Sequence, residues 1–302
     1  NPGVARTALI RVGGQSFTVN QLAAPGTHRT KYDFDGDGRA DIAVFRPTTN
    51  LWYIQNSQTG FGAVFFGEAT DKLAAADYDG DGRTDVAVFR PSNGFWYRLN
   101  SSNGSFVATQ FGQAGDLPVP ADFDGDGRAE LVVYRPSNGT WYILNAVNNQ
   151  FSSLRFGAAE DIPVPADYDG DGKADYAVFR PSNGTWYLQQ TVAGFAGIPF
   201  GIATDKLAPA DYDGNGRTDL AVYRAGVWYL LLNKTTFRAV AFGAAEDVPA
   251  AADYNGDKSA DIAVFRPSNG GWYVWSCTNN AQFNYTAFGL GSDRIPQAVA
   301  QP

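Results

Sequence analysis

Six short acidic stretches are the residues most able to do chemistry in this sequence. The clearest one runs from Asp167 to Asp175 and reads Asp-Tyr-Asp-Gly-Asp-Gly-Lys-Ala-Asp. Carboxylates at positions 1, 3, 5 and 9, with a backbone carbonyl at position 7, can wrap a hard cation that takes 6–8 oxygen ligands. Glycines at positions 4 and 6 allow the positive φ values that such a tight wrap demands. Without a cation, the carboxylates would repel one another and raise each other's pKa.

The alternative interpretation of these stretches is a set of solvated Asp-Gly turns that bind nothing. Six copies at ligand spacing favour metal binding over this alternative. Calcium is favoured over magnesium because flexible loops with several carboxylates suit the larger ion. We expect the ions to have a structural role rather than a regulatory or catalytic one.

The six stretches recur at nearly even intervals. They begin at Asp33, Asp77, Asp122, Asp167, Asp211 and Asp253, so the spacings are 44, 45, 45, 44 and 42 residues. A period in this range predicts a solenoid or the blades of a propeller. We therefore expect one continuous array over the 302 residues rather than two unrelated domains.

The charge of the chain is concentrated in these stretches. They contain 22 of the 31 acidic side chains. Six bound Ca²⁺ ions would add twelve positive charges and turn the formal net charge of −8 into about +4. The low pI therefore indicates metal loops rather than an acidic surface. No apolar run approaches the ~20 residues of a membrane span, and we expect neither nucleic acid nor membrane insertion among the chain's partners.

The cysteine content bears on what holds the fold together. Cys277 is the single cysteine, so no internal disulfide can form. Bound metal would take over the stabilising role, and millimolar extracellular calcium suits weak, open sites. We therefore expect a secreted or cell-surface protein. The chain starts at Asn1 and contains no Met, which indicates a mature product or an excised fragment.

Each repeat contains four strand-like pieces. Short segments of small residues and proline precede each acidic loop, and proline belongs on edge strands. An apolar run such as Val86–Phe89 follows the loop and predicts a strand covered on both faces. Arg-Pro-Ser-Asn-Gly then predicts a hairpin. A third piece contains Trp-Tyr, and a fourth, more polar piece ends in Phe-Gly. No segment has a sustained 3.6-residue apolar period, so the chain is predicted to be all-β.

The two ends of the chain are predicted to complete the array. Residues 16–22 align with residues 105–111, which places the N-terminus in the back half of a repeat. Asp293-Arg294-Ile295 matches Asp205-Lys206-Leu207 and predicts the first strand of a further unit. We therefore expect one domain over residues 1–302, a seven-bladed β-propeller of four-stranded antiparallel blades whose last blade is closed by both termini. The predicted blades span about 29–66, 72–111, 116–156, 161–200, 205–242, 247–288, and 293–302 together with 1–22.

The repeat resembles the FG-GAP and VCBS repeats known from integrin α-subunit propellers and bacterial surface proteins. The resemblance rests on the acidic loop, the Ala-Val-Phe-Arg-Pro that follows it and the closing Phe-Gly. It implies that each loop joins the first and second strands of a blade and binds Ca²⁺ through positions 1, 3, 5 and 9 and the carbonyl of position 7. The implied ligands of the first four sites are Asp33, Asp35, Asp37, Arg39 and Asp41; Asp77, Asp79, Asp81, Arg83 and Asp85; Asp122, Asp124, Asp126, Arg128 and Glu130; and Asp167, Asp169, Asp171, Lys173 and Asp175.

The last two loops depart from this pattern. The fifth has an Asn at position 5 and should bind more weakly; the sixth has an Asn at position 3 and Lys258 where glycine normally stands. A non-glycine residue in the left-handed region costs roughly 1–2 kcal/mol, so we expect the sixth site to be the last to fill. Their implied ligands are Asp211, Asp213, Asn215, Arg217 and Asp219, and Asp253, Asn255, Asp257, Ser259 and Asp261. Up to six Ca²⁺ ions are thus expected.

Other repeated residues have competing interpretations. The Trp-Tyr pairs could stack on sugar rings, but their place within an apolar strand favours a core between blades. The arginine before each Pro could bind an anion, but pairing with a repeated acid such as Asp71, Asp116, Asp161, Asp205 or Asp247 is favoured.

Little in the sequence supports catalysis. His28 is the only histidine, and Cys277 has no motif around it that suggests a nucleophile. We therefore expect a non-enzymatic recognition or adhesion module for a glycan or an extracellular protein. The alternatives are a lyase-like polysaccharide-active enzyme on a propeller scaffold and a structural spacer of a larger surface protein.

Overall fold

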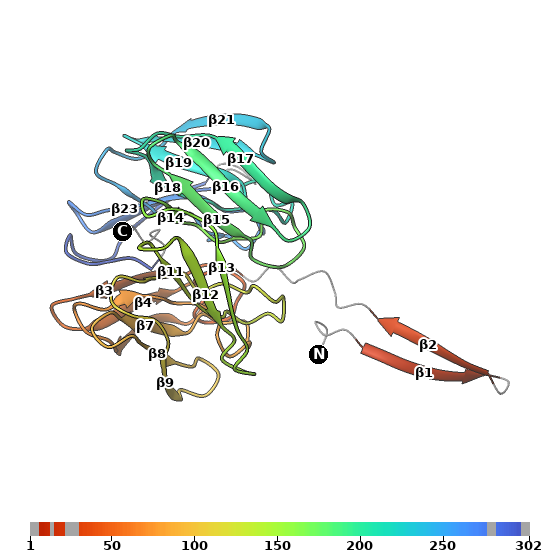
Figure 1. The fold of residues 1–302 in the computed structure, drawn as a ribbon. Coiled ribbons are helices and arrows are strands. Elements are labelled where there is room, and N and C mark those ends of the chain that lie inside the picture. Colours follow the sequence, from red (N-terminus) through yellow and green to blue (C-terminus); the bar gives the residue numbers. More distant parts are fainter. Residues whose placement is uncertain (1–5, 13–14, 22–29, 277–281, 297–302) are drawn as a thin grey trace.

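The computed structural model describes residues 6–12, 15–21, 30–276 and 282–296, and every regular element in these ranges is a β-strand. Five sheets have four antiparallel strands and one has three, and together they form the blades of a propeller (Figure 1). A separate hairpin pairs β1 (Arg6–Val12) with β2 (Gln15–Gln21), and Figure 1 shows it apart from the blades. No helix of the described part is long and apolar enough to cross a membrane.

The strands of each blade follow one another in sequence order from the channel outward. The innermost strands have two residues each: β6 (Lys72–Leu73), β10 (Leu117–Pro118), β14 (Ile162–Pro163), β18 (Lys206–Leu207) and β22 (Val248–Pro249). The second strands are β3 (Ile42–Arg46), β7 (Val86–Arg90), β11 (Leu131–Arg135), β15 (Tyr176–Arg180), β19 (Leu220–Arg224) and β23 (Ile262–Arg266).

The third and fourth strands complete each blade toward solvent. The third strands are β4 (Leu51–Asn56), β8 (Phe95–Leu99), β12 (Thr140–Leu144), β16 (Thr185–Gln190), β20 (Val227–Leu232) and β24 (Gly271–Trp275). The outer strands are β5 (Gly60–Phe65), β9 (Phe106–Gln110), β13 (Phe151–Arg155), β17 (Gly194–Pro199), β21 (Thr236–Ala241) and β25 (Phe283–Ala287). The four strand-like pieces of the repeat are therefore confirmed.

The core lies between neighbouring blades. The second strands are almost entirely buried, as expected from apolar residues on both of their faces. Each third strand contributes one fully buried tryptophan, whose indole N–H donates to the carbonyl of the Phe that ends the same blade, as Trp141 does to Phe156 at 2.8 Å. The interpretation of the tryptophans as core residues is therefore confirmed.

The prediction of seven blades is wrong, because the described residues form six. Phe45 in β3 exchanges backbone hydrogen bonds of 2.7 and 2.9 Å with Arg294, as Phe89 pairs with Lys72 in the second blade. Asp293-Arg294-Ile295 therefore supplies the missing innermost strand of the first blade. The same junction buries Ile295 beside Val44 and residues of the last blade. The N-terminal hairpin is not part of the first blade, and residues 1–5, 13–14, 22 and 297–302 of the predicted seventh blade lie outside the described residues.

Candidate metal centres

In five blades the acidic loop connects the innermost strand to the second strand, as the repeat predicted, whereas the first loop precedes β3 and the innermost strand of that blade comes from the other end of the chain. In the fourth loop, the two carboxylate oxygens of Asp167 accept the N–H groups of Gly170 and Gly172 at 2.5 and 2.8 Å. Both glycines have positive φ, 80° and 85°. Asp175 accepts the N–H of Tyr168 at 2.9 Å, which ties position 9 to position 2. These bonds curl the chain so that its carboxylates converge.

A second segment, the turn between the third and fourth strands, completes each loop. Thr191 donates its N–H to Asp175 at 2.8 Å and its hydroxyl to Asp171 at 2.5 Å, while the N–H of Val192 donates to Asp169 at 2.8 Å. Positions 3, 5 and 9 thus face this turn. Sequence reasoning missed these turn residues, although a Ser, Thr or Asn 14 to 16 residues after position 9 recurs in the other five loops: Ser57, Ser101, Asn145, Asn233 and Ser276.

The carboxylates come close enough to share one ion in five loops. In each, three carboxylate oxygens from three residues lie within 4.8 Å of one another. The groups are Asp33, Asp35 and Asp37; Asp77, Asp79 and Asp85; Asp122, Asp124 and Glu130; Asp167, Asp169 and Asp175; and Asp211, Asp213 and Asp219. Positions 1 and 3 belong to every group, and position 9 belongs to four of them. In the second, third and fourth groups, position 5 stands outside the trio.

Two observations show that these loops fit a divalent cation. Oδ1 of Asp35 and Oδ1 of Asp169 are buried and have no hydrogen-bond partner, which is costly for an ionised oxygen. In addition, burial and then neighbouring acids raise the pKa of Asp41, Asp85, Asp175 and Asp219 to about 6, and that of Glu130 to about 7. Burial also raises the pKa of Asp33, Asp122, Asp167 and Asp211. A bound cation would supply the missing positive charge.

The sixth loop does not form such a group among the described residues. Its Asn255 amide donates to Asp257 and to Asp261, both at 3.1 Å. Lys258 has a φ of 73°, so it adopts the left-handed conformation that its glycine counterparts adopt elsewhere. The expectation that this loop departs most from the pattern is confirmed in its geometry.

The loops are joined to one another in a closed ring. The N–H at position 8 of each loop donates to the carbonyl at position 1 of the preceding one, as Ala174 does to Asp122 at 2.6 Å, and Ala40 closes the ring onto Asp253 at 2.6 Å. The side chain at position 7 lies over the position-4 glycine of the preceding loop: Arg83 Nε would be 2.8 Å from a Cβ on Gly36. The six position-7 residues are Arg39, Arg83, Arg128, Lys173, Arg217 and Ser259.

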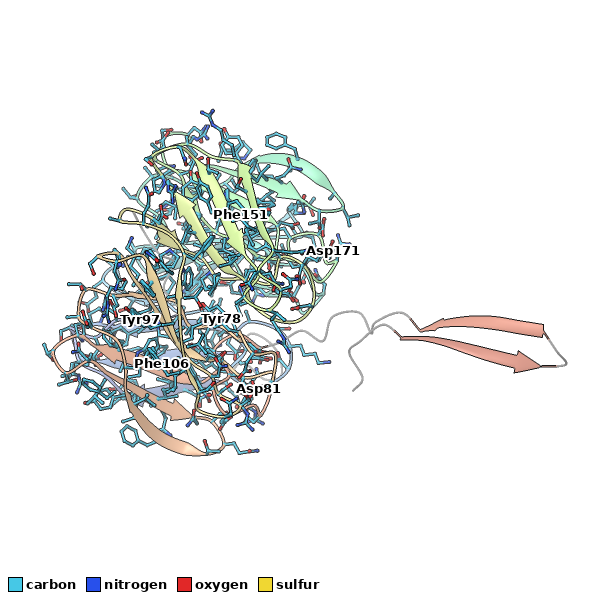
Figure 2. The ribbon with its side chains drawn as sticks, turned by 60° about the horizontal axis from the view of Figure 1, so that its bottom comes forward. Tyr78, Asp81, Tyr97, Phe106, Phe151 and Asp171 are labelled. Carbon is cyan, nitrogen blue, oxygen red and sulfur yellow. The ribbon has the colours of Figure 1, made fainter. Side chains whose placement is uncertain are left out.

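The position-7 residues also belong to their own loops. The N–H of each donates to the side chain of position 5, as the N–H of Lys173 does to Asp171 at 2.9 Å. The metal-ligand role that the sequence gave their carbonyls stays a prediction. The loops surround a central channel of about 960 Å³ that prolines and alanines of the innermost strands line. Figure 2 labels Asp81 and Asp171 in two different loops, and both lie on the right of the blades in that view.

The opposite end of the second strand has a different set of buried acids. Arg180 donates from Nε and from its second terminal nitrogen to the two oxygens of Asp161, at 2.7 and 2.8 Å, and the Asp161 side chain is fully buried. The same bidentate pair occurs in every blade. The other pairs are Arg46–Asp293, Arg90–Asp71, Arg135–Asp116, Arg224–Asp205 and Arg266–Asp247. The predicted arginine pairing is confirmed, and Asp293 serves the first blade.

Each of these arginines also lies against the tyrosine of the Trp-Tyr pair. The guanidinium carbon is 4.3–4.9 Å from the ring centroid in the six blades. On the tyrosine rests a phenylalanine of the outer strand, such as Phe106 on Tyr97, with centroids 6.1 Å apart and planes 20° apart (Figure 2). We call this Asp-Arg-Tyr-Phe stack the aromatic column of a blade.

The phenylalanines that end the columns are exposed. Their exposed fractions are 57–64%, and they are Phe61, Phe106, Phe151, Phe195, Phe237 and Phe283. Sequence reasoning did not single them out. The available signal was an aromatic residue 9 to 11 positions after each Trp. Of the two residues considered for catalysis, both His28 and Cys277 lie outside the described residues.

Comparisons with known proteins agree with this architecture. A family profile described as FG-GAP-like repeat matches residues 33–88, 77–133, 122–178 and 167–222. No curated protein sequence gives a significant match. A solved structure of an Agrocybe aegerita lectin, described as recognising non-reducing terminal N-acetylglucosamine, is 20% identical, with a TM-score of 0.56 over 88% of this chain and 79% of the lectin chain.

Two lyase structures have the same fold. A streptogramin B lyase is 8% identical, with a TM-score of 0.55 over 87% of each chain. A virginiamycin B lyase from Staphylococcus aureus is 6% identical, with a TM-score of 0.53 over 93% of this chain and 88% of the other. At these identities the likeness concerns the fold alone.

Proposed function

Since the chain belongs to the FG-GAP-like repeat family, we propose that it is a calcium-stabilised, non-enzymatic recognition module that binds glycans through its aromatic columns. The observation that carries the proposal is the exposed phenylalanine at the end of each column. A single exposed aromatic residue needs no explanation, but here one stands at the equivalent place of each of the six described blades, stacked on the tyrosine of its column. An aromatic face can stack on the C–H face of a sugar ring while nearby polar groups bind its hydroxyls.

The surroundings of the columns suit a sugar better than an apolar partner. Asn93 donates to the hydroxyl of Tyr97 at 2.9 Å, and Asn138, Asn183 and Asn269 make the same contact in their blades. These asparagines are exposed and so offer further hydrogen-bonding groups beside the rings. The column below is rigid because a bidentate ion pair holds the arginine under the tyrosine.

The sixfold repetition favours a repetitive ligand. One asymmetric protein partner would contact a few columns, whereas a glycan with repeated units, or a clustered array of glycans, can occupy several. Weak binding at each column then adds up through effective concentration. The fold accommodates this activity, since the Agrocybe aegerita structure with the same fold is described as a lectin.

The acids of the chain support a non-enzymatic role. Acids that would bind Ca²⁺ in the loops are unavailable for proton transfer, and the buried acids at the other end of the second strands are engaged by arginine. We also propose a secreted or cell-surface location, because the open loops suit millimolar calcium.

Glycan-array binding followed by titration calorimetry tests the proposal. We expect Phe151→Ala to weaken binding of a polymeric glycan severalfold, and substitution of all six column phenylalanines to abolish it. Phe65→Ala is the matched control, because Phe65 is 71% exposed on an outer strand but makes no ring contact among the described residues. Unchanged binding by the sixfold variant, or depolymerisation of the glycan, would contradict the proposal.

A further inference from the structure

At position 3, the sixth loop has an amide side chain, where the first five loops have a carboxylate. Nδ2 of Asn255 lies 3.1 Å from Asp257 Oδ2, 3.1 Å from Asp261 Oδ1 and 2.7 Å from Ser276 Oγ. These three acceptors stand at position 5, position 9 and the turn after the third strand. The same three places converge in the fourth loop, where Asp171, Asp175 and Thr191 meet.

The orientation of this amide is fixed by its neighbours. Its oxygen accepts the N–H of Asp257 at 2.8 Å, so its nitrogen faces the two carboxylates. The reverse orientation would place the amide oxygen against both carboxylates, where it would be repelled. The NH₂ group provides two hydrogen atoms, which the buried Ser276 hydroxyl and the carboxylates share. The acids of this loop thus already have a partner with positive partial charge.

None of the other loops has an amide donor at position 3, although turn asparagines donate to acids of the third and fifth loops. Position 3 is an aspartate in the first five loops, and an ionised aspartate can only accept hydrogen bonds. In the fifth loop, Asn215 at position 5 donates to Asn233 rather than to an acid. In the third loop, Asn145 of the turn donates to Asp124 and Glu130, yet the three carboxylates of that loop still gather within 4.8 Å. Among the described loops, only the sixth lacks three carboxylate oxygens within 4.8 Å of one another.

We propose that the Asn255 amide takes the place of the cation in the sixth loop, so that the chain binds five calcium ions and its last blade is stabilised without metal. The sixth loop lies where the first and last blades meet, so its stability affects the closure of the ring. The sixth loop accepts the ring-closing bond from Ala40 at the Asp253 carbonyl, and its blade packs on the first blade beside Ile295. The junction where the two ends of the ring meet would then stay assembled when calcium is scarce.

Native mass spectrometry of the full chain in calcium provides the test. The wild-type chain should bind five ions, and Asn255→Asp should bind six, because a carboxylate at position 3 removes the amide donor and restores the ligand. Asn215→Asp is the control, because it adds an acid to a loop that already has a carboxylate group and should leave the count at five. Six ions on the wild-type chain, or an unchanged count on a folded Asn255→Asp variant, would overturn the inference.

Hydrogen exchange of the wild-type chain provides a test that needs no variant. Addition of EDTA should speed amide exchange in residues 167–175 at least tenfold and leave residues 253–261 unchanged. Equal acceleration in both loops would overturn the inference. The inference rests on calcium binding by the other five loops. A chain that binds no calcium at all would contradict that premise, and with it the calcium part of the proposed function, whereas a count of six would contradict the inference alone.

Discussion

Each blade buries carboxylates at both ends of its second strand, and the two ends stabilise them by different means. At one end, Asp161 has a guanidinium of its own blade at 2.7 Å. At the other, Asp167, Asp169 and Asp175 gather within 4.8 Å, and the Lys234 ammonium of the next blade interacts with them electrostatically but appears in none of their hydrogen bonds. A buried charge is tolerated when it is paired. The carboxylate at the first end is therefore paired within the chain, whereas under the proposed function the carboxylates at the second end take an ion from solution.

Removal of calcium should have the largest effect, because it acts on one end of five blades at once. At a free concentration one hundred times Kd, each site stabilises the folded chain by about 2.7 kcal/mol. We expect EDTA to lower the melting temperature strongly in differential scanning calorimetry, with recovery on addition of Ca²⁺. An unchanged melting curve would mean that the two ends do not differ as described.

Loss of an acid at the arginine-paired end of the second strand should destabilise the fold almost as much, but independently of calcium. Asp161→Ala leaves the Arg180 guanidinium without its partner and should lower the free energy of unfolding by about 3 kcal/mol. The loss should be the same in calcium and in EDTA, measured by urea denaturation. The control is Glu160→Ala, which removes an exposed neighbouring acid. A loss that appeared only in calcium would contradict the distinction between the ends.

Loss of an acid in a calcium loop should instead destabilise the fold mainly when calcium is present. Asp171→Ala should abolish one site and cost up to about 2.7 kcal/mol in saturating calcium, but much less in EDTA. Asp257→Ala is the matched change in the sixth loop, and we expect a small cost that is equal in both conditions. Native mass spectrometry gives the ion count of each variant, and equal calcium dependence of the two variants would contradict the difference between their loops.

The pH dependence sharpens the comparison further, with a smaller expected effect. In the metal-free chain, burial raises the pKa of Asp175 and its counterparts to about 6, against about 3.9 in an unfolded chain. The folded state then binds more protons between these values, so its stability falls as the pH rises from about 4 to 6. With calcium bound, the ionised form is favoured and stability should instead rise with pH. Thermal melts at pH 4.5, 5.5 and 6.5, with and without calcium, check this inversion.

Much of the candidate site could be read from local sequence. The spacing of Asp167, Asp169 and Asp175, with glycines between them, specifies a loop whose carboxylates converge, because its wrapping depends on residues within nine positions. The partners of these acids could not be read in the same way. Thr191 reaches the loop only because β15 and β16 fold back as a hairpin. Nothing in the sequence around Thr191 distinguishes it from any other polar residue in a turn.

The contacts of the exposed phenylalanines likewise could not be predicted from local sequence. Phe106 lies in a polar outer strand, and only the cross-strand register places it on Tyr97 rather than free in solvent. The arginine pairs, by contrast, follow from the sequence within a blade, where Arg180 and Asp161 are 19 residues apart.

By itself the sequence determined an all-β array of repeats, with acidic loops between first and second strands and a tryptophan core, because each depends on periods and spacings inside one repeat. The number of blades was decided only by the tertiary structure. Asp293-Arg294-Ile295 has the sequence of an innermost strand whether it starts a new blade or completes an old one. It pairs with β3, 247 residues away at the Arg46–Asp293 contact, because β3 is the second strand that lacks an innermost neighbour of its own. A free strand edge, a nonlocal property, thus fixed the ring at six blades.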